Sequence, residues 1–154
     1  MPTFVLTDER EKHMGQNAGG VEIALDECWD LVAHEEVGRL AYRLVDEIHV
    51  VPVNHVVRDG VLLFRTSAGN KLLAAALGEA VAFEVDWFGP HSAWSVEVRG
   101  QLRRLEDDEH ERLDETVALP WVDGPRSDLV ALEPAHVSGR RFKLRRGRGA
   151  ALPV

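Results

Sequence analysis

Hydrophobic and polar residues alternate with a period of two along much of the chain, a pattern typical of half-buried β-strands. In VGRLAYRLV, Leu40, Tyr42 and Leu44 fall on one face of an extended segment, and Arg39 and Arg43 fall on the other. This arrangement predicts a strand with one face toward a core and the other toward solvent.

Five later segments also favour extended structure. HVVPVNHVV is rich in β-branched residues, and Asp59-Gly60 separates it from VLLFRT, which is a strong hairpin signal. AVAFEVDWF and AWSVEVRGQLRRLE follow, with a Gly-Pro-His-Ser turn between them. The last segment, DLVALEPAHVSGRRFKLR, predicts a strand that Pro134 interrupts.

Three shorter segments have helical character. DECWDLVAHEEV starts with Asp26 as an N-cap candidate and gathers Trp29 and Val32 toward one side. NKLLAAALG predicts a compact helix with Asn70 as its cap and Gly78 as its stop. DDEHERLDETVAL has three acids in its opening turn, where they complement the helix dipole.

Six or so strands with short helices between them show no regular β-α-β alternation, which argues against a parallel doubly wound sheet. We therefore predict a mainly β fold, a small antiparallel barrel with appended helices. The length of 154 residues fits one domain with a genuine core. Residues 1–24 contain three glycines and little periodicity, so we expect a mobile N-terminal arm.

Composition and hydropathy limit the cellular compartments in which we expect this protein. The single cysteine, Cys28, excludes an internal disulfide and a cysteine-based zinc site, and it fits a reducing cytosol. No apolar run approaches the roughly 20 residues that span a bilayer, and the first residues lack the apolar core of a signal peptide. We expect a cytoplasmic protein with no membrane partner.

Charge is unevenly distributed along the chain. The net charge is −8, yet residues 140–154 hold six basic residues and no acid. A basic tail can bind nucleic acid, but the acidic body would repel a phosphate backbone and no aromatic residue follows Phe142. We therefore expect no nucleic-acid partner, and a last strand that ends in a basic, solvated tail.

The common catalytic and metal-binding motifs are absent from the sequence. There is no phosphate-binding P-loop, no dinucleotide-binding glycine motif and no nucleophile elbow. Seven histidines are scattered without metal-ligand spacing, and His49 and His55 would lie roughly 20 Å apart on one strand. No metal site is predicted.

One stretch, FRTSAGNKLL, suggests an anion-binding site. Arg65 offers a planar guanidinium that suits phosphate, and Thr66 and Ser67 offer hydroxyl donors at the end of the predicted strand. Lys71 lies at the start of the following helix, whose free N–H groups also favour an anion. An ordinary solvated strand end explains these residues equally well.

Several segments in order give the chain a resemblance to a known family. GRLAY, VVPVNHVV, VLLFRTSAGNKLLAAAL, AVAFEVD, AWSVEVRGQLRRLED, PWVDG and LVALEPAHVSGRRF resemble the pyridoxamine 5′-phosphate oxidase-like flavin-binding proteins over roughly residues 22–145. The resemblance is greatest to small bacterial and actinobacterial flavin-binding members. It implies a six-stranded antiparallel split β-barrel of the FMN-binding type over residues 25–146, with a flexible basic tail at 147–154, and a homodimer with FMN at the interface.

The resemblance also implies site residues. It makes Arg65, Thr66, Ser67 and Lys71 ligands of the flavin phosphate and ribityl chain. The remaining cofactor-binding positions that it implies lie on the strand beside the flavin ring, on a later strand and on a loop that reaches the partner's site: Pro52, Val53, Asn54, Trp94, Ser95 and Trp121. His55 and Tyr42 are further candidates for lying near the ring, and Gly139, Arg140 and Arg141 match the family's final strand as flavin contacts or as structural support.

The sequence departs from the family pattern near the C-terminus, and this difference bears on the activity. Vitamin B6 oxidases of this family carry a tryptophan followed by an arginine-and-histidine pattern near the C-terminus, and here neither tryptophan nor histidine follows residue 136. The resemblance therefore implies an FMN-dependent oxidoreductase that passes electrons from a reduced nicotinamide or another small donor to a small organic acceptor or oxygen. The alternatives are a barrel that uses a deazaflavin or haem, and a flavin carrier or sensor without turnover.

Overall fold

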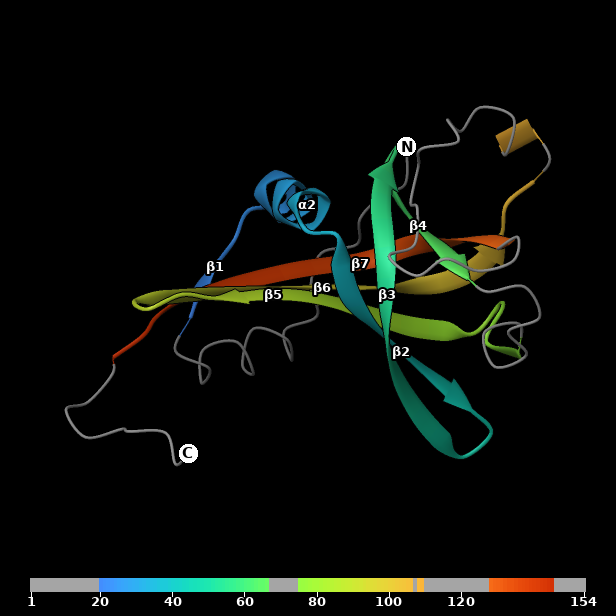
Figure 1. Ribbon diagram of the computed structural model, residues 1–154, viewed down its shortest axis with the longest axis horizontal. Coiled ribbons are helices and arrows are strands. Elements are labelled where there is room, and N and C mark those ends of the chain that lie inside the picture. Colours follow the sequence, from blue (N-terminus) through green and yellow to red (C-terminus); the bar gives the residue numbers. More distant parts are fainter. Residues whose placement is uncertain (1–19, 67–74, 107, 110–127, 146–154) are drawn as a thin grey trace.

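The computed structural model describes residues 20–66, 75–106, 108–109 and 128–145. Within these ranges the chain forms one helix of several turns and seven strands (Figure 1). They are β1 (Val21–Glu22), α2 (Leu25–His34), β2 (Val37–Leu44), β3 (Glu47–Arg58), β4 (Val61–Thr66), β5 (Ala80–Phe88), β6 (Ser92–Arg104) and β7 (Asp128–Lys143).

The strands form a closed antiparallel barrel. Hydrogen-bonded neighbours follow the order β7-β4-β3-β2-β5-β6, and β6 pairs with β7 to close the ring. β1 pairs with the C-terminal end of β7, at Arg140 and Arg141, and adds a short seventh strand. This arrangement is the predicted mainly β, six-stranded split barrel, and the predicted fold class is confirmed.

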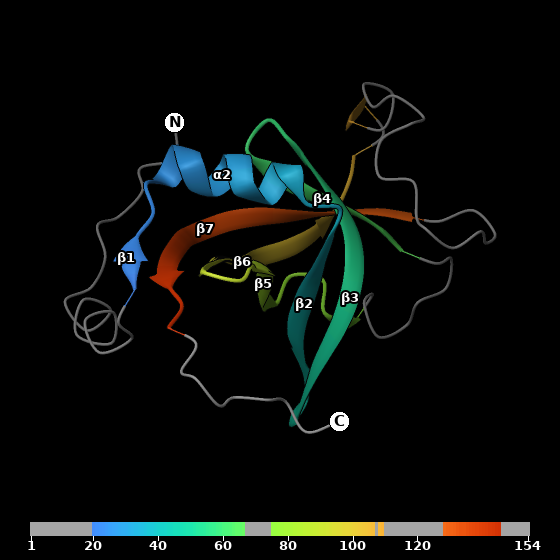
Figure 2. The same cartoon turned by 60° about the vertical axis from the view of Figure 1, so that its left-hand side comes forward.

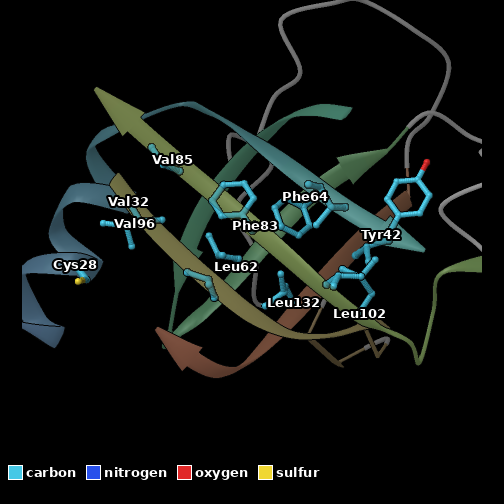
Figure 3. Packing of buried hydrophobic residues seen from close by; sticks show 14 of the residues in the cluster. Cys28, Val32, Tyr42, Leu62, Phe64, Phe83, Val85, Val96, Leu102 and Leu132 are labelled. Atoms are coloured by element: carbon cyan, nitrogen blue, oxygen red, sulfur yellow. The ribbon is translucent and has the colours of Figure 1, made fainter. Parts of the chain in front are cut away.

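The barrel interior holds the main hydrophobic core (Figure 3). Alternate residues of each strand point inward, and Leu40, Phe64, Phe83 and Val96 are fully buried. The helix α2 lies along one side of the sheet, in contact with β7, β3 and β6 (Figure 2), and buries Val32. The sequence pattern of β2 is confirmed, since Leu40 and Tyr42 are buried and Arg39 and Arg43 are exposed.

One turn and one β-bulge agree with the sequence predictions. Asp59 and Gly60 both have positive φ, 50° and 74°, which is the backbone of the tight turn expected between β3 and β4. At Pro134, β7 bulges: Arg99 pairs with His136 and Gly100 with Pro134, so Ala135 is the extra residue. Proline has no N–H to give to a ladder, which accounts for the irregularity there.

Two expectations at the N-terminal end were wrong. The barrel begins before residue 25, because Val21 and Glu22 pair with β7 and Ile23 is buried in the core. Asp26 does not cap α2; the helix starts at Leu25 after Ala24, without a side-chain cap. The hydrogen bond from Ile23 N–H to the Gly139 carbonyl fixes how the chain enters the helix, so tertiary pairing takes the place of a local cap.

The other predicted helices lie largely outside the described residues. Of the segment around Asn70 only the end is described, where Gly78 has a φ of 80°, the conformation expected of a residue that ends a helix. Of the later segment only Asp108 and Glu109 are described, both helical. No helix in the described ranges has the length and apolar character needed to cross a bilayer.

Candidate functional site

Within the closed barrel, β3 and β4 pair over only part of their lengths. Their ladder runs from the Arg58–Val61 pair at the turn to the His55–Phe64 pair and ends there. Beyond it, β3 continues along β2, where Pro52 pairs with Arg39, while β4 continues along β7, where Arg65 pairs with Leu129. Asn54 and Arg65, the next residues of the two strands, therefore lie on the two sides of the point where the strands part, which we call the opening between β3 and β4.

This opening brings together two predicted groups of flavin ligands. Pro52, Val53 and Asn54 follow its β3 side, and Arg65 and Thr66 follow its β4 side. Two predicted ligand groups that are separated by a hairpin in the sequence thus meet at the point where the strands diverge. Ser67, Lys71 and Trp121 lie outside the described residues, as do the side chains of Arg65 and Thr66, so their roles stay predictions.

A second set of residues lies on the outer face of the barrel. Directly paired residues of antiparallel strands project to the same face. Pro52 pairs with Arg39, Arg39 with Glu84, and Glu84 with Glu97, which forms one row across β3, β2, β5 and β6. One step along, Asp86 pairs with Ser95 on this face.

Trp94 lies on the opposite face from Ser95, because successive strand residues alternate. Its half-buried ring packs against the main core, and together with Trp87 it faces α2. Val53 likewise packs against the core. The structure thus places Pro52, Asn54 and Ser95 on the outer face and Val53 and Trp94 on the inner one, and whether the latter two contact a flavin remains a prediction.

An open groove of about 680 Å³ continues the outer face. Small residues form part of its lining, among them Ala41 and Ala82, which are a cross-strand pair. Arg99, Gln101 and His136 supply polar groups at its sides. A floor of alanines beside polar walls suits a flat organic molecule.

Charged groups meet on this face next to the groove. Arg39 Nη1 donates to Glu84 Oε2 at 3.1 Å and to Asp86 Oδ2 at 3.2 Å. Burial first, and then the neighbouring Asp86, raise the pKa of Glu84 to about 7, although Arg39 acts in the opposite direction. The same two acids raise the pKa of the Arg39 guanidinium, which stays charged.

His55 and Tyr42 have different surroundings. The His55 ring is buried inside the barrel, where Nε2 lies 2.7 Å from the Val32 carbonyl of α2 and the ring meets Phe83 edge-on. Burial lowers the pKa of His55, so the neutral ring donates Nε2–H to that carbonyl. Tyr42 lines the groove and stacks on His49, with ring centroids 5.5 Å apart.

Gly139, Arg140 and Arg141, the residues that match the family's final strand, each have a structural contact, and whether any of them also contacts a flavin stays a prediction. A Cβ on Gly139 would lie 2.6 Å from Cys28 Sγ, so the glycine lets α2 pack closely on β7. Arg140 donates to the Gly20 carbonyl, and Arg141 pairs with Glu27 at 2.6 Å. Burial raises the pKa of the Cys28 thiol to about 11, so this thiol is protonated at neutral pH.

Metal ligands are not gathered at any point of the described chain: no group of three or more histidine, cysteine or acidic side chains is placed to hold an ion there. Arg39, Glu84 and Asp86 were not predicted from the sequence as site residues. Alternation along β2 and β5 was a signal that these side chains face outward, but their meeting depends on the register between strands more than forty residues apart.

Comparison with known proteins identifies the family of this barrel. Residues 24–141 match the family described as "Pyridoxamine 5′-phosphate oxidase". The uncharacterized protein Rv0080 of Mycobacterium tuberculosis is 33% identical over 129 residues, which are 79% of this chain and 85% of that protein.

Two solved structures share the fold. An FAD binding protein from Mycobacterium smegmatis is 33% identical with a TM-score of 0.67, covering 80% of this chain and 99% of its own. A Corynebacterium glutamicum protein provisionally classed as a pyridoxamine 5′-phosphate oxidase is 27% identical with a TM-score of 0.70. The match covers 83% of this chain and 97% of that protein. Because the family match spans most of the chain, from residue 24 into β7, this protein belongs to the pyridoxamine 5′-phosphate oxidase-like family of flavin-binding split barrels.

Proposed function

We propose that this protein is a flavin-dependent oxidoreductase that binds FMN at the opening between β3 and β4. The observation that carries the proposal is the divergence of the two strands after the His55–Phe64 pair. It brings the strand that resembles a ring-contacting strand, at Pro52 to Asn54, beside the strand end that resembles a phosphate-binding site, at Arg65 and Thr66.

The described residues fit such a cofactor. Pro52 has no N–H, so β3 has a break in its hydrogen-bonding groups where the ring would lie. Arg65 at the end of β4 suits a phosphate, and Ser95 and the alanine floor are on the outer face that Pro52 shares. The flavin supplies the hydride or electron transfer, and the protein residues bind it, orient it and shield one of its faces.

FAD is a second candidate because the Mycobacterium smegmatis relative, at 33% identity, is named an FAD binding protein. FMN and FAD share the ring, the ribityl chain and the first phosphate. The Arg65 site would therefore serve either, and the adenylate half of FAD would need further room beyond it. Deazaflavin and haem are the remaining alternatives.

The absorbance spectrum of the purified protein tests the proposal. Co-purified or added FMN should give the two-banded visible spectrum of a bound oxidised flavin, and anaerobic addition of NADH or NADPH should bleach it. A protein that binds no flavin, or that yields only the intense single band of haem, would contradict the proposal. Bound flavin that no nicotinamide reduces would favour another donor or a carrier without turnover.

We also propose that two copies complete the site. Ile48 and Val50 lie on the outer side of β3, in line with Pro52, and are 77% and 62% exposed. A flat ring needs cover on both faces, and a second copy that packs on these side chains would supply it. We do not expect this protein to oxidise vitamin B6, because neither tryptophan nor histidine follows residue 136.

A pair of charge substitutions tests the assembly. Ile48→Glu with Val50→Glu should turn a dimer into a monomer in sedimentation velocity and weaken flavin binding, because two carboxylates would be buried at the contact. Val21→Glu on β1 is the matched control, since Val21 is 73% exposed but lies at the far edge of the sheet. An unchanged dimer in the double variant would place the contact elsewhere.

A further inference from the structure

Two acidic side chains on the outer face share a single arginine nitrogen. Arg39 Nη1 lies 3.1 Å from Glu84 Oε2 and 3.2 Å from Asp86 Oδ2. The two carboxyl groups are therefore held close together by one cation. Burial and the neighbouring Asp86 disfavour the ionised form of Glu84, so Glu84 is the member of this pair that is suited to hold an exchangeable proton.

Of the charged groups near Glu84, Asp86 favours a proton on its carboxyl group and Arg39 opposes it. Asp86 lies on the same strand, Arg39 on β2, and Glu97 lies directly opposite on β6, where it pairs with Arg99 at 3.4 Å. From β3 the row ends in Pro52, which carries no charge. Burial and Asp86 raise the pKa of Glu84 to about 7. A group that is half protonated near pH 7 is well suited to proton transfer.

Glu84 lies close to both the proposed flavin site and the groove, although it does not line the groove itself. It shares the outer face with Pro52 and Ser95, two positions of the proposed flavin site. Ala82, two residues before it on this face, lies on the floor of the groove, roughly 7 Å along the strand. The side chain of Glu84 is 34% exposed, so water can return a proton to it after each transfer.

We propose that Glu84 is the proton donor for a small acceptor with a polarised double bond that is reduced in this groove, and that Asp86 and Arg39 position it. The inference rests on the proposed flavin function. When bound, a reduced flavin would supply two electrons and one hydrogen as hydride to one end of the double bond. As that π bond breaks, the Glu84 O–H bond would break and its proton would go to the other end. Glu84 would be left as a carboxylate, which water reprotonates.

The first test needs no cofactor. Carboxyl carbon NMR of the flavin-free protein should show Glu84 titrating near pH 7, and Asp86→Asn should move that titration to lower pH, because it removes the negative neighbour. Titration of Glu84 in the ordinary range of a glutamate, near pH 4, would overturn the inference whether or not the protein binds flavin.

The second test compares two electron acceptors in single-turnover reoxidation of the photoreduced flavin protein without oxygen. Menadione needs a proton for each hydride it takes, whereas ferricyanide takes electrons alone. The wild-type menadione rate divided by the ferricyanide rate should fall above about pH 7, as Glu84 loses its proton. In Glu84→Gln the same ratio should be lower by roughly 100-fold at pH 7 and no longer depend on Glu84 titration.

Glu97→Gln is the matched control, because Glu97 is on the same face but outside the carboxyl pair and the groove lining. It should leave the wild-type ratio and pH profile in place, and Asp86→Asn should shift that profile to lower pH. A Glu84→Gln protein with the wild-type ratio and profile would overturn the inference and leave the proposed function standing. A wild-type protein that binds no flavin would overturn both the inference about Glu84 and the proposed function.

Discussion

Phe83 and Glu84 are neighbours on β5, and they belong to two different environments. Phe83 points into the barrel, is fully buried and contacts His55 and Phe64 through its ring. Glu84 points outward into a row of polar side chains beside an open groove. The inner face of the strand is occupied by residues that close packing requires, whereas the outer face carries charged groups that the fold does not need. This difference is one reason why we propose that the chemistry of this protein takes place on the outer face.

The largest loss of stability should follow from removing a buried side chain on the inner face. Phe83→Ala should lower the free energy of unfolding by about 3 to 5 kcal/mol, because it removes a buried ring and leaves a cavity among Phe64, His55 and their neighbours. Urea unfolding followed by tryptophan fluorescence measures it. Glu84→Gln, one residue along, should change stability by less than about 0.5 kcal/mol. Equal losses of unfolding free energy in the two variants would show that the two faces contribute equally to stability.

A smaller effect on the inner face should depend on pH. Because burial lowers the pKa of His55, the folded protein resists protonation there. The stabilisation is present above the unfolded pKa near 6.5 and is lost as pH falls below it toward the lower folded value. His55→Gln keeps an N–H donor for the Val32 carbonyl but does not titrate. We expect the variant to be less stable at pH 7.5 by about 1 to 3 kcal/mol, through poorer packing.

Urea unfolding at pH 7.5 and pH 5 separates the two contributions of His55. The wild type should lose more stability between these values than His55→Gln does. Parallel losses in the two proteins would mean that His55 does not titrate on unfolding in this range, and the pH dependence would then belong to other groups.

The smallest effect should come from the ion pairs of the outer face. The Arg39 side chain is 55% exposed, and exposed pairs contribute little to stability. Arg39→Gln should therefore cost less than about 1 kcal/mol in urea unfolding, with the difference shrinking further in 1 M salt. A loss as large as that of Phe83→Ala would show that the outer face is structural after all.

The fold was predictable from the sequence because its signals are local. Alternation in β2, Asp59-Gly60 at the first hairpin and Pro134 at the bulge each act within a few residues. Asp26 was the wrong choice of helix cap, since the entry to α2 is set by the bond from Ile23 to Gly139, far away in the chain. Local patterns do not contain that pairing.

The candidate site was predictable only in part. The strand end at Arg65 and the β3 segment at Pro52 could be read from residue types and resemblance. The separation of Trp94 from Ser95 follows from strand alternation, whereas the meeting of Arg39 with Glu84 and Asp86 follows from the β2–β5 register. Register is determined by packing of the whole barrel, so the acidic pair emerges only from the folded chain.

The central claim is that a flavin phosphate binds at the end of β4, and titration of the flavin-free protein with FMN and with riboflavin tests it most directly. FMN should bind more tightly, and Arg65→Ala should weaken FMN roughly 10- to 150-fold, the equivalent of one charge-assisted contact of about 1.5 to 3 kcal/mol. Riboflavin affinity should hardly change. Arg58→Ala, at the far end of the β3–β4 hairpin, should leave both affinities as they are. Equal affinities for FMN and riboflavin in the wild type, unaltered by Arg65→Ala, would contradict the account.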